Sequence, residues 1–424
     1  DGSAVTAQLP LQKAEEEAAP AYRDTETVRV SIFLEDAPTI SKFDVQNIAE
    51  NQAALAYRAG LETRQETLAQ AISTQALGGK QLDVVWNLTL AANIISANVE
   101  YGKIAAIEQV PGVEQVLLET QYAPAVVDTD LPNDPNMSTS SAMIGSSAAW
   151  AAGYTGAGSR IAVIDTGTDT DHQSFSAAGF DYSLAKQAEQ AGKAVADYNL
   201  LDVEEITGVL DQLHVGNGVT ALQLYRNTKL PFGYNYIDKD LDITHDQDRQ
   251  GEHGSHVAGI ATANAYIPSA DGTFAGALDA VKVQGVAPDA QLITMKVFGK
   301  AGGAYDSDYL AAIEDAIVLK CDVVNLSLGS SNPGEARHAK AEYQAILDRL
   351  AETGMVVSIS AGNAGSWVES AQNAGYLYSD DVSMDMVGSP GSYTNSLCVA
   401  SIDNAGATGE YFLVGDTTVV YTQS

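Results

Sequence analysis

The stretch SRIAVIDTG, residues 159–167, is a short apolar run that ends on Asp165 and is followed by a small residue and a glycine. Three later stretches have the same character: AQLITMKVF (290–298), DVVNLSLGS (322–330) and GMVVSISAGN (354–363). Helical patterns such as SDYLAAIEDAIVLK lie between them. Apolar runs that alternate with helices predict a parallel sheet covered by helices on both faces. Chemistry is then expected at the carboxyl edge, where these strands end.

Three polar side chains are candidates for that chemistry. Asp165 ends the first run, His253 opens the helical pattern HGSHVAG, and Asn363 follows the fourth run. A neutral imidazole can take up a proton near neutral pH, a carboxylate can orient it, and an amide can donate a hydrogen bond to a developing oxyanion. Considered one at a time, these residues are equally typical of a structural aspartate, a helix cap and an asparagine turn.

A second histidine, His256, raises the alternative of a zinc site. The H-E-x-x-H motif places its histidines four residues apart with the glutamate between them, whereas Glu252 precedes both histidines here. The acidic stretch 238–248 lacks the glycine and the distal glutamate of an EF-hand loop, so we interpret it as a solvated loop. We therefore predict no metal ligand and no cofactor for the chemistry, while a structural calcium ion stays open.

The first 125 residues have a different pattern, typical of a small α+β unit. Its expected elements are a strand at 27–34, a helix at 45–77, strands at 82–90 and 92–99, a helix at 101–110 and a strand at 113–124. This β-α-β-β-α-β order predicts a ferredoxin-like arrangement. The stretch 126–147 is rich in Asp, Pro, Asn and Ser, and we expect it to be exposed and open to proteolysis.

The composition excludes several classes of partner. The 424 residues carry 22 Lys and Arg against 55 Asp and Glu, a formal net charge of -33. Such a field repels nucleic acid and anionic membranes, so we set both aside. No apolar run approaches the roughly 20 residues of a membrane span, and the first ten residues have no signal-peptide pattern. Cys321 and Cys398 lie in apolar runs, which favours two buried thiols over the alternative of a disulfide.

Together, Asp165, His253 and Asn363 resemble the subtilisin-like serine protease family. VIDTG, HGSHVAG, VVNLSLGS and ISAGNAG stand in that family's order between residues 140 and 405. The resemblance implies that Asp165 orients the base, His253 is the general base and Asn363 is the oxyanion donor. It also implies the substrate-binding residues, which are Ser327, Leu328 and Gly329 in the specificity pocket and Gly302 and Gly303 beside the substrate backbone.

Finer features resemble the large cell-envelope branch of this family, the lactocepin- and C5a peptidase-like proteases. LPFGYNYID (230–238), GVAPDAQLITMKVF (285–298) and a mostly helical insert at 183–213 are similar to that branch. The resemblance implies an extracellular bacterial protein, secreted or attached to the cell envelope, in which His256 is a packing residue. Ser174 stands where compact members place a calcium-binding aspartate, which puts that calcium site in doubt.

The same resemblance implies three segments. Residues 1–125 would be an inhibitory propeptide that assists folding and leaves its C-terminal segment in the substrate cleft. Residues 126–141 would be an exposed linker that contains the self-cleavage site. Residues 142–424 would be the N-terminal part of the catalytic domain, ending near the start of an inserted protease-associated domain.

The family's nucleophile is missing from these 424 residues. Its serine lies in a G-T-S-[MA]-x-P stretch, and GSPGSY, GSSAAW and AGSWVES do not have that form. Three hypotheses follow: a companion C-terminal fragment of the same precursor carries the serine, the chain has been shortened, or the protein is a catalytically inactive peptide-binding module. We predict a serine endopeptidase for proteins or peptides, whose serine is supplied by the missing part, so that this chain alone is inactive.

Overall fold

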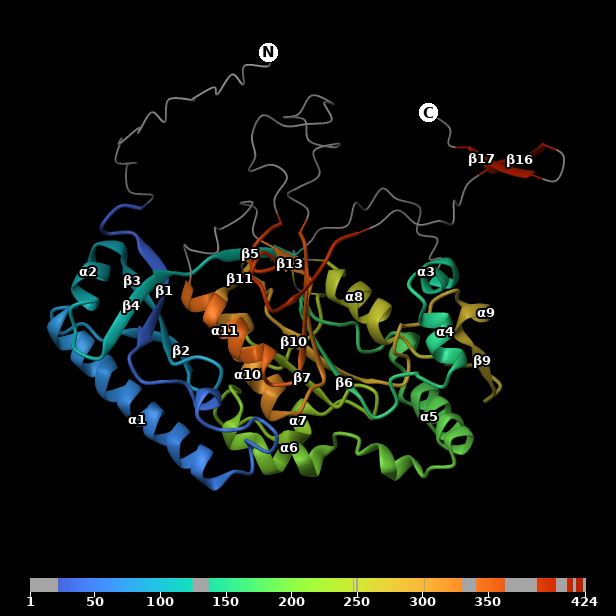
Figure 1. The fold of residues 1–424 in the computed structure, drawn as a ribbon, viewed down its shortest axis with the longest axis horizontal. Coiled ribbons are helices and arrows are strands. Elements are labelled where there is room, and N and C mark those ends of the chain that lie inside the picture. Colours follow the sequence, from blue (N-terminus) through green and yellow to red (C-terminus); the bar gives the residue numbers. More distant parts are fainter. Residues whose placement is uncertain are drawn as a thin grey trace, which may run out of the picture.

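The structure is a computed structural model of the chain (Figure 1). It describes residues 22–124, 137–246, 248, 251–300, 302–329, 341–362, 387–401, 410–414 and 417–421. A six-stranded parallel sheet forms the centre of a larger unit, and a four-stranded antiparallel sheet belongs to a smaller N-terminal unit. Figure 1 shows the smaller unit beside the larger one, with α1 and α2 on its outer side.

The parallel sheet has the strand order β15-β14-β12-β6-β10-β7. Its strands are β6 (Arg160–Asp165), β7 (Phe232–Asn235), β10 (Gln291–Lys296), β12 (Val323–Leu326), β14 (Val356–Ser360) and β15 (Leu397–Val399). Every residue of β6 is buried, and the strand pairs in parallel with β10 and β12. A strand buried on both faces has to be apolar throughout, which explains the continuous apolar runs. The predicted covered parallel sheet is confirmed.

Helices cover both faces of this sheet. Ala162 and Ile164 of β6 share an apolar core with the helix α10 (Asp306–Val318). Ile161 and Val163 point to the opposite face, because side chains alternate along a strand. They pack in a separate core with Ala258 of α8 (His253–Thr262). A further helix, α11 (Ala341–Ala351), contacts β14.

The smaller unit has the expected β-α-β-β-α-β order. Its elements are β1 (Thr27–Leu34), α1 (Gln52–Gln75), β2 (Asp83–Leu88), β3 (Ile94–Glu100), α2 (Ile104–Ile107) and β4 (Val113–Leu118), and its sheet order is β2-β3-β1-β4. Ile72 of α1 and Ile107 of α2 are fully buried in its own core. Helix α1 begins later than the expected residue 45, because Asn51 caps it by accepting hydrogen bonds from the N–H groups of Ala53 and Ala54.

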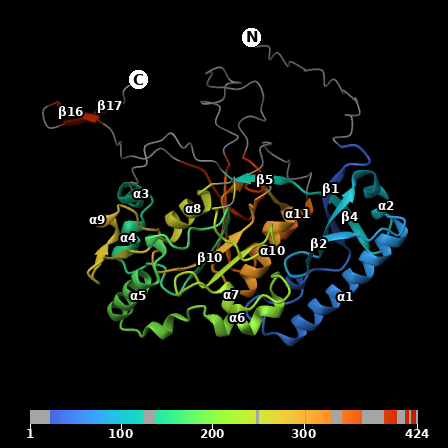
Figure 2. The same cartoon turned by 180° about the vertical axis from the view of Figure 1, so that it is seen from behind.

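The two units dock through α10, which lies between them in Figures 1 and 2. Trp86 of β2 shares an apolar core with Leu310 of α10. The buried Glu314 of α10 accepts backbone hydrogen bonds from Leu90, Ala91 and Ala92 at 2.9, 2.7 and 3.2 Å. Hydrogen bonds to a carboxylate are stronger than hydrogen bonds between two neutral groups. This contact therefore fixes the geometry in which the two units dock and also stabilises the docked state.

Apart from the 15-residue α5, the remaining helices and strands of the described residues are short. They are β5 (Gln121–Pro124), α3 (Met137–Met143), α4 (Ser146–Ala151), α5 (Ala177–Ala191), α6 (Val203–Val209), α7 (Ala221–Leu224), β8 (Tyr266–Pro268), β9 (Phe274–Gly276), α9 (Ala277–Ala280), β11 (Ala304–Tyr305), β13 (Leu328–Gly329), β16 (Glu410–Val414) and β17 (Thr417–Tyr421). The insert at 183–213 is mostly helical, as expected. It contains the last part of α5, which ends at the left-handed Gly192, then a 3-10 helix (Val195–Tyr198), α6 and a second 3-10 helix (Leu210–Gln212).

Both cysteines are free thiols, and only one of them is buried. Cys321 lies in the core, and burial raises the pKa of its thiol to about 12. Cys398 is exposed on β15, at the edge of the parallel sheet, so the expectation of two buried thiols is wrong for this residue. Among the helices of the described ranges, none is long and apolar enough to span a membrane.

Candidate active site

Asp165 and His253 meet at the carboxyl edge of the parallel sheet. Asp165 is the last residue of β6, and His253 is the first residue of α8. The Nδ1 atom of His253 lies 2.7 Å from Oδ1 of Asp165, and the two side chains are 9% and 1% exposed. A carboxylate at Nδ1 holds the ring in the tautomer whose Nε2 can accept a proton. Nε2 makes no hydrogen bond within the described part of the chain.

The residue after the aspartate joins the strand to the helix. The backbone N–H of Thr166 donates to Oδ1 of Asp165 at 2.7 Å, and its Oγ1 accepts the N–H of Gly254 at 2.8 Å. A Cβ at Gly254 would collide with the backbone of Gly167. Glycine in the first turn of α8 therefore lets the helix begin directly against the strand end, which brings His253 to Asp165.

The buried ammonium group of Lys296 holds the backbone next to Asp165 in place. Lys296, the last residue of β10, donates to the carbonyl oxygens of Thr166 and Thr244, each at 2.8 Å, and to the carboxylate of Asp248. Lys296 is 1% exposed. Its three acceptors are carbonyl and carboxylate oxygens, the ligands that a hard metal ion prefers, so the ammonium acts as a built-in cation. Lys296 was not among the predicted site residues, although a lysine inside the apolar run ITMKVF is a signal of a buried charge.

β5 lies between β11 and β13, and we call the space between these two strands, which β5 occupies, the groove. β5 pairs antiparallel with β11 on one side, placing Tyr122 opposite Ala304, and with β13 on the other, placing Ala123 opposite Gly329. Gly303 precedes β11 directly, and a Cβ there would collide with the carbonyl oxygen of Tyr122. Gly302 lies next along the same edge, and Ser327 and Leu328 lie on the β13 side. The structure thus places Gly302, Gly303, Leu328 and Gly329 beside the extended segment β5, and Ser327 directly precedes β13.

Two other expectations have different outcomes. Asn363 lies outside the described residues, because the range that contains β14 stops at Gly362, so its role as oxyanion donor stays a prediction. His256 is exposed on α8, whereas we expected a packing residue. Partial burial and the nearby His253 lower the pKa of His256, which keeps it neutral beside the Asp165–His253 pair.

The acidic stretch 238–248 is held together by amide and lysine side chains. The Asn235 amide donates to Asp238 and Asp240 at 3.2 and 3.1 Å, and Lys300 lies 3.9 Å from Asp240. Within the described part of the chain, no group of three or more His, Cys, Asp and Glu side chains is arranged to hold a metal ion.

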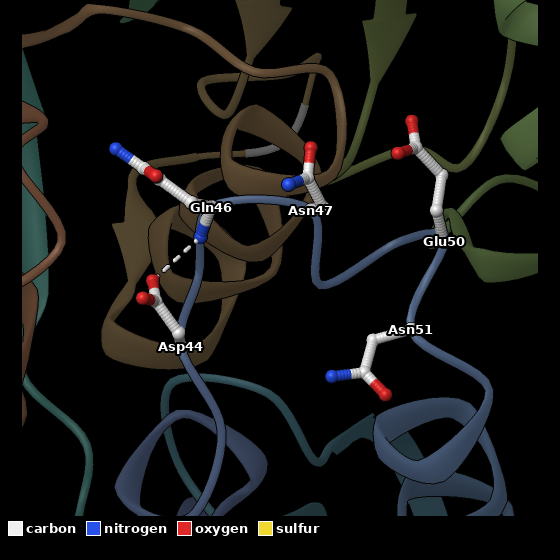
Figure 3. Close-up of a pocket in the computed structure, with 5 residues that line it drawn as sticks. All are labelled: Asp44, Gln46, Asn47, Glu50 and Asn51. Carbon is white, nitrogen blue, oxygen red and sulfur yellow. Dashed lines mark hydrogen bonds between the residues drawn. The ribbon is translucent and has the colours of Figure 1, made fainter.

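A separate cavity of about 470 Å³ lies at the start of α1 (Figure 3). Its lining contains only carboxylates and amides, from Asp44, Gln46, Asn47, Glu50 and Asn51. Glu50 pairs with Lys320, which follows the C-terminal end of α10, at 2.7 Å. The cavity is thus at the opposite end of α10 from β5, and neither Asp165 nor His253 lines it, so we assign it no part in the chemistry.

The chain belongs to the subtilase family of peptidases, Peptidase_S8, whose profile matches residues 156–418. The matched range includes Asp165, His253 and the expected substrate-binding residues, which are Gly302, Gly303, Ser327, Leu328 and Gly329. The resemblance inferred from the sequence motifs is therefore confirmed at the level of the family.

Relatives within the family include large bacterial proteases. The PI-type proteinase of Lactococcus lactis subsp. cremoris is 31% identical over 77% of this chain, and the match covers 15% of that protein. The minor extracellular protease Vpr of Bacillus subtilis is 29% identical over 54% of the chain and 21% of its own length. The C5a peptidase of Streptococcus pyogenes is 28% identical over 58% of the chain and 18% of its own length. The chain thus spans a small part of these relatives.

Proposed function

We propose that this chain is part of a serine endopeptidase in which His253 is the general base and Asp165 orients it. The observation that carries the proposal is the 2.7 Å contact between these two side chains at the carboxyl edge of the sheet. In this mechanism Nε2 of His253 takes the proton of a serine hydroxyl as the serine attacks a peptide carbonyl, and returns it to the leaving amine. Asp165 stabilises the imidazolium that forms, and Asn363 would donate a hydrogen bond to the oxyanion.

The serine itself would lie on a part of the protein that these 424 residues do not include. No G-T-S stretch of the family's form occurs in the chain, and the match to the PI-type proteinase covers only 15% of that relative. A companion C-terminal part would then complete the triad and the sheet. The chain alone would bind peptides and would not hydrolyse them.

Residues 1–125 would be an inhibitory propeptide, followed by a linker at 126–141 and the first part of the catalytic domain at 142–424. The support is the position of β5, which pairs with both β11 and β13 as a peptide substrate would. The smaller unit also has its own apolar core, as an independently folding inhibitor requires. Self-cleavage in the linker would leave β5 bound as a product.

A secreted or envelope-attached enzyme fits this proposal. One relative is named an extracellular protease, and the net charge of -33 suits an exposed, soluble surface.

A serine-directed phosphonate probe tests the endopeptidase on the full-length protein. We expect covalent labelling of one serine outside these 424 residues, loss of labelling in His253→Ala and unchanged labelling in the matched control His172→Ala. His172 lies beyond the strand end and accepts the N–H of Ser174, so it makes no contact with the pair. Labelling that survives His253→Ala contradicts the proposed base.

The alternative is a peptide-binding module without catalysis, which the missing serine stretch favours. It predicts peptide binding with no probe labelling, even in the full-length protein. Chelator-sensitive hydrolysis without labelling would instead indicate a metallopeptidase.

A further inference from the structure

The tyrosine of β5 is buried in the larger unit. Tyr122 is 2% exposed, and its ring packs edge-to-face against that of Tyr309, with the centroids 5.7 Å apart and the planes at 71°. Both strands that flank β5 offer backbone pairing to any extended peptide, so the backbone pairing does not select a sequence. Selectivity has to come from the pockets that receive the side chains.

The hydroxyl group of Tyr122 is bound by the buried carboxylate of Asp306. Oδ1 of Asp306 accepts the hydroxyl of Tyr122 at 2.8 Å and that of Tyr309 at 3.0 Å. Oδ2 accepts the backbone N–H of Thr120 at 2.7 Å. Asp306 is 1% exposed and, like Tyr309, belongs to α10 of the larger unit. The recognising groups would therefore remain when β5 is replaced by another peptide.

We propose that the groove between β11 and β13 contains a phenol-binding subsite, in which Asp306 selects a tyrosine side chain of the peptide substrate. This inference rests on the proposed function, because it treats β5 as the stand-in for a substrate. The position selected is the residue that pairs with Ala304, as Tyr122 does here. A phenylalanine at this position would fill the same space and leave the carboxylate without that donor.

The protonation state of the phenol suits this role. Burial and the charge of Asp306 raise the pKa of Tyr122 well above its usual value. The hydroxyl therefore stays protonated and donates a hydrogen bond to the carboxylate. A buried acceptor that loses a donor is costly, and a site built to bind a hydroxyl rejects the analogue without it. Tyr309 still donates to the same oxygen when the ligand lacks a hydroxyl, which limits the discrimination. We expect tyrosine to be preferred over phenylalanine by roughly 10- to 100-fold.

The test uses quenched fluorogenic peptides of the sequence ETQYAPAVVD, which copies residues 119–128, and the same peptides with phenylalanine for tyrosine. On the full-length protein, the ratio of kcat/KM for the two peptides measures the preference. β5 competes with both peptides equally, so the ratio does not depend on whether the smaller unit has left the groove. Asp306→Ala should reduce the ratio to within about 3-fold of unity, whereas Tyr309→Phe, which removes the other donor to the same oxygen, should keep the ratio or increase it.

Matched peptides with a reduced, non-cleavable backbone separate this inference from the proposed function. Equal turnover of the tyrosine and phenylalanine peptides overturns the subsite and leaves the endopeptidase intact. Tighter binding of the tyrosine analogue without any turnover supports the subsite and refutes the endopeptidase. Equal binding without turnover refutes both. The wild-type ratio decides the question even if Asp306→Ala does not fold.

Discussion

Two aspartate–histidine pairs in this molecule have almost the same geometry. Nδ1 of His253 lies 2.7 Å from Asp165, and Nδ1 of His214 lies 2.8 Å from Asp315. Both histidine side chains are 9% exposed. The pairs differ in what the other ring nitrogen meets. Nε2 of His214 faces the carbonyl of Asn87 at 3.2 Å and the carboxylate of Glu314 at 3.5 Å, both at the junction of the two units.

This difference separates the proposed base, His253, from a structural cation, His214. Burial lowers the pKa of His214, but the charges of Asp315 and Glu314 outweigh it, and the pKa is raised. With acceptors at both nitrogens, His214 is suited to carry a proton on each and to bind the smaller unit through them. His253 has one acceptor, at Nδ1, and its Nε2 makes no hydrogen bond among the described residues, which is the arrangement that the proposed general base requires. The paired distance alone does not identify a catalytic histidine.

The largest expected effect is the loss of activity on replacing His253, compared with the replacement of His214. In the full-length protein, His253→Ala should reduce kcat by roughly 10⁴-fold or more, because the base is lost. His214→Gln should leave kcat within about 3-fold once the smaller unit has separated, since His214 contacts the junction only. Steady-state hydrolysis of one peptide by both variants provides the measurement. A comparable loss in both variants would make the two pairs equivalent and remove the distinction.

The next effect concerns how the first pair is supported. Lys296→Met would leave Asp248 buried without its counter-charge, and we expect a loss of about 3–5 kcal/mol in the free energy of unfolding in urea. Lys300→Met, at a lysine 48% exposed, is the matched control and should change it by less than about 0.5 kcal/mol.

A proton NMR spectrum gives a second measure of the Lys296 effect. In the wild type, the Nδ1 proton of His253 should resonate at low field, and in Lys296→Met this signal should shift or broaden while that of His214 stays in place. An unchanged His253 signal would mean that Lys296 supports the fold without positioning the pair.

The docking of the smaller unit should weaken as the pH rises. Burial, followed by the charge of Asp306, raises the pKa of Glu119 from 4.5 to about 7 in the docked state, against the hydrogen bonds of Ser96 and Ser307. A raised pKa contributes stability below pH 4.5 that is lost as the pH rises towards 7, and the raised pKa of His214 acts in the same direction at higher pH. Asp308 adds to the negative charge that faces Glu119.

Glu119→Gln should remove this dependence. Urea unfolding of the wild type should lose up to roughly 3 kcal/mol between pH 4.5 and 7 from this group, and the variant should lose much less over the same interval. The neighbouring Glu108→Gln, on the exposed end of α2, is the control and should retain the wild-type slope. Equal slopes in Glu119→Gln and the wild type would show that Glu119 is ionised in the docked state.

The smallest expected effect concerns the stability of the His214–Asp315 pair at the junction of the two units. The buried hydroxyl of Tyr236 donates to Oδ2 of Asp315 at 2.8 Å. Tyr236→Phe should cost about 1–2 kcal/mol in the free energy of unfolding, since one donor to a charged acceptor is lost. Tyr154→Phe, at a tyrosine 76% exposed, should be neutral within about 0.5 kcal/mol. A neutral Tyr236→Phe would mean that Asp315 is satisfied by His214 alone.

The sequence predicted the parallel sheet because its buried strands need continuous apolar runs, and those runs are visible without a structure. It predicted the family because Asp165 and His253 lie in short stretches whose glycines, such as Gly254, are required by close backbone packing. The exact helix bounds were harder to predict, since the Asn51 cap and not the apolar pattern decides where α1 begins. The environment of Cys398 was mispredicted because its apolar run forms an edge strand.

The sequence by itself thus determined the sheet, the family and the residue types of the candidate site. Only the tertiary structure decided which partners those residues meet. Lys296, Asp306 and His214 are single polar residues, and their roles depend on groups roughly 50 to 190 residues away along the chain. Burial makes these charges effective, because a carboxylate or ammonium removed from water has to find its partners within the fold. That requirement fixed β5 in its groove and distinguished one aspartate–histidine pair from the other.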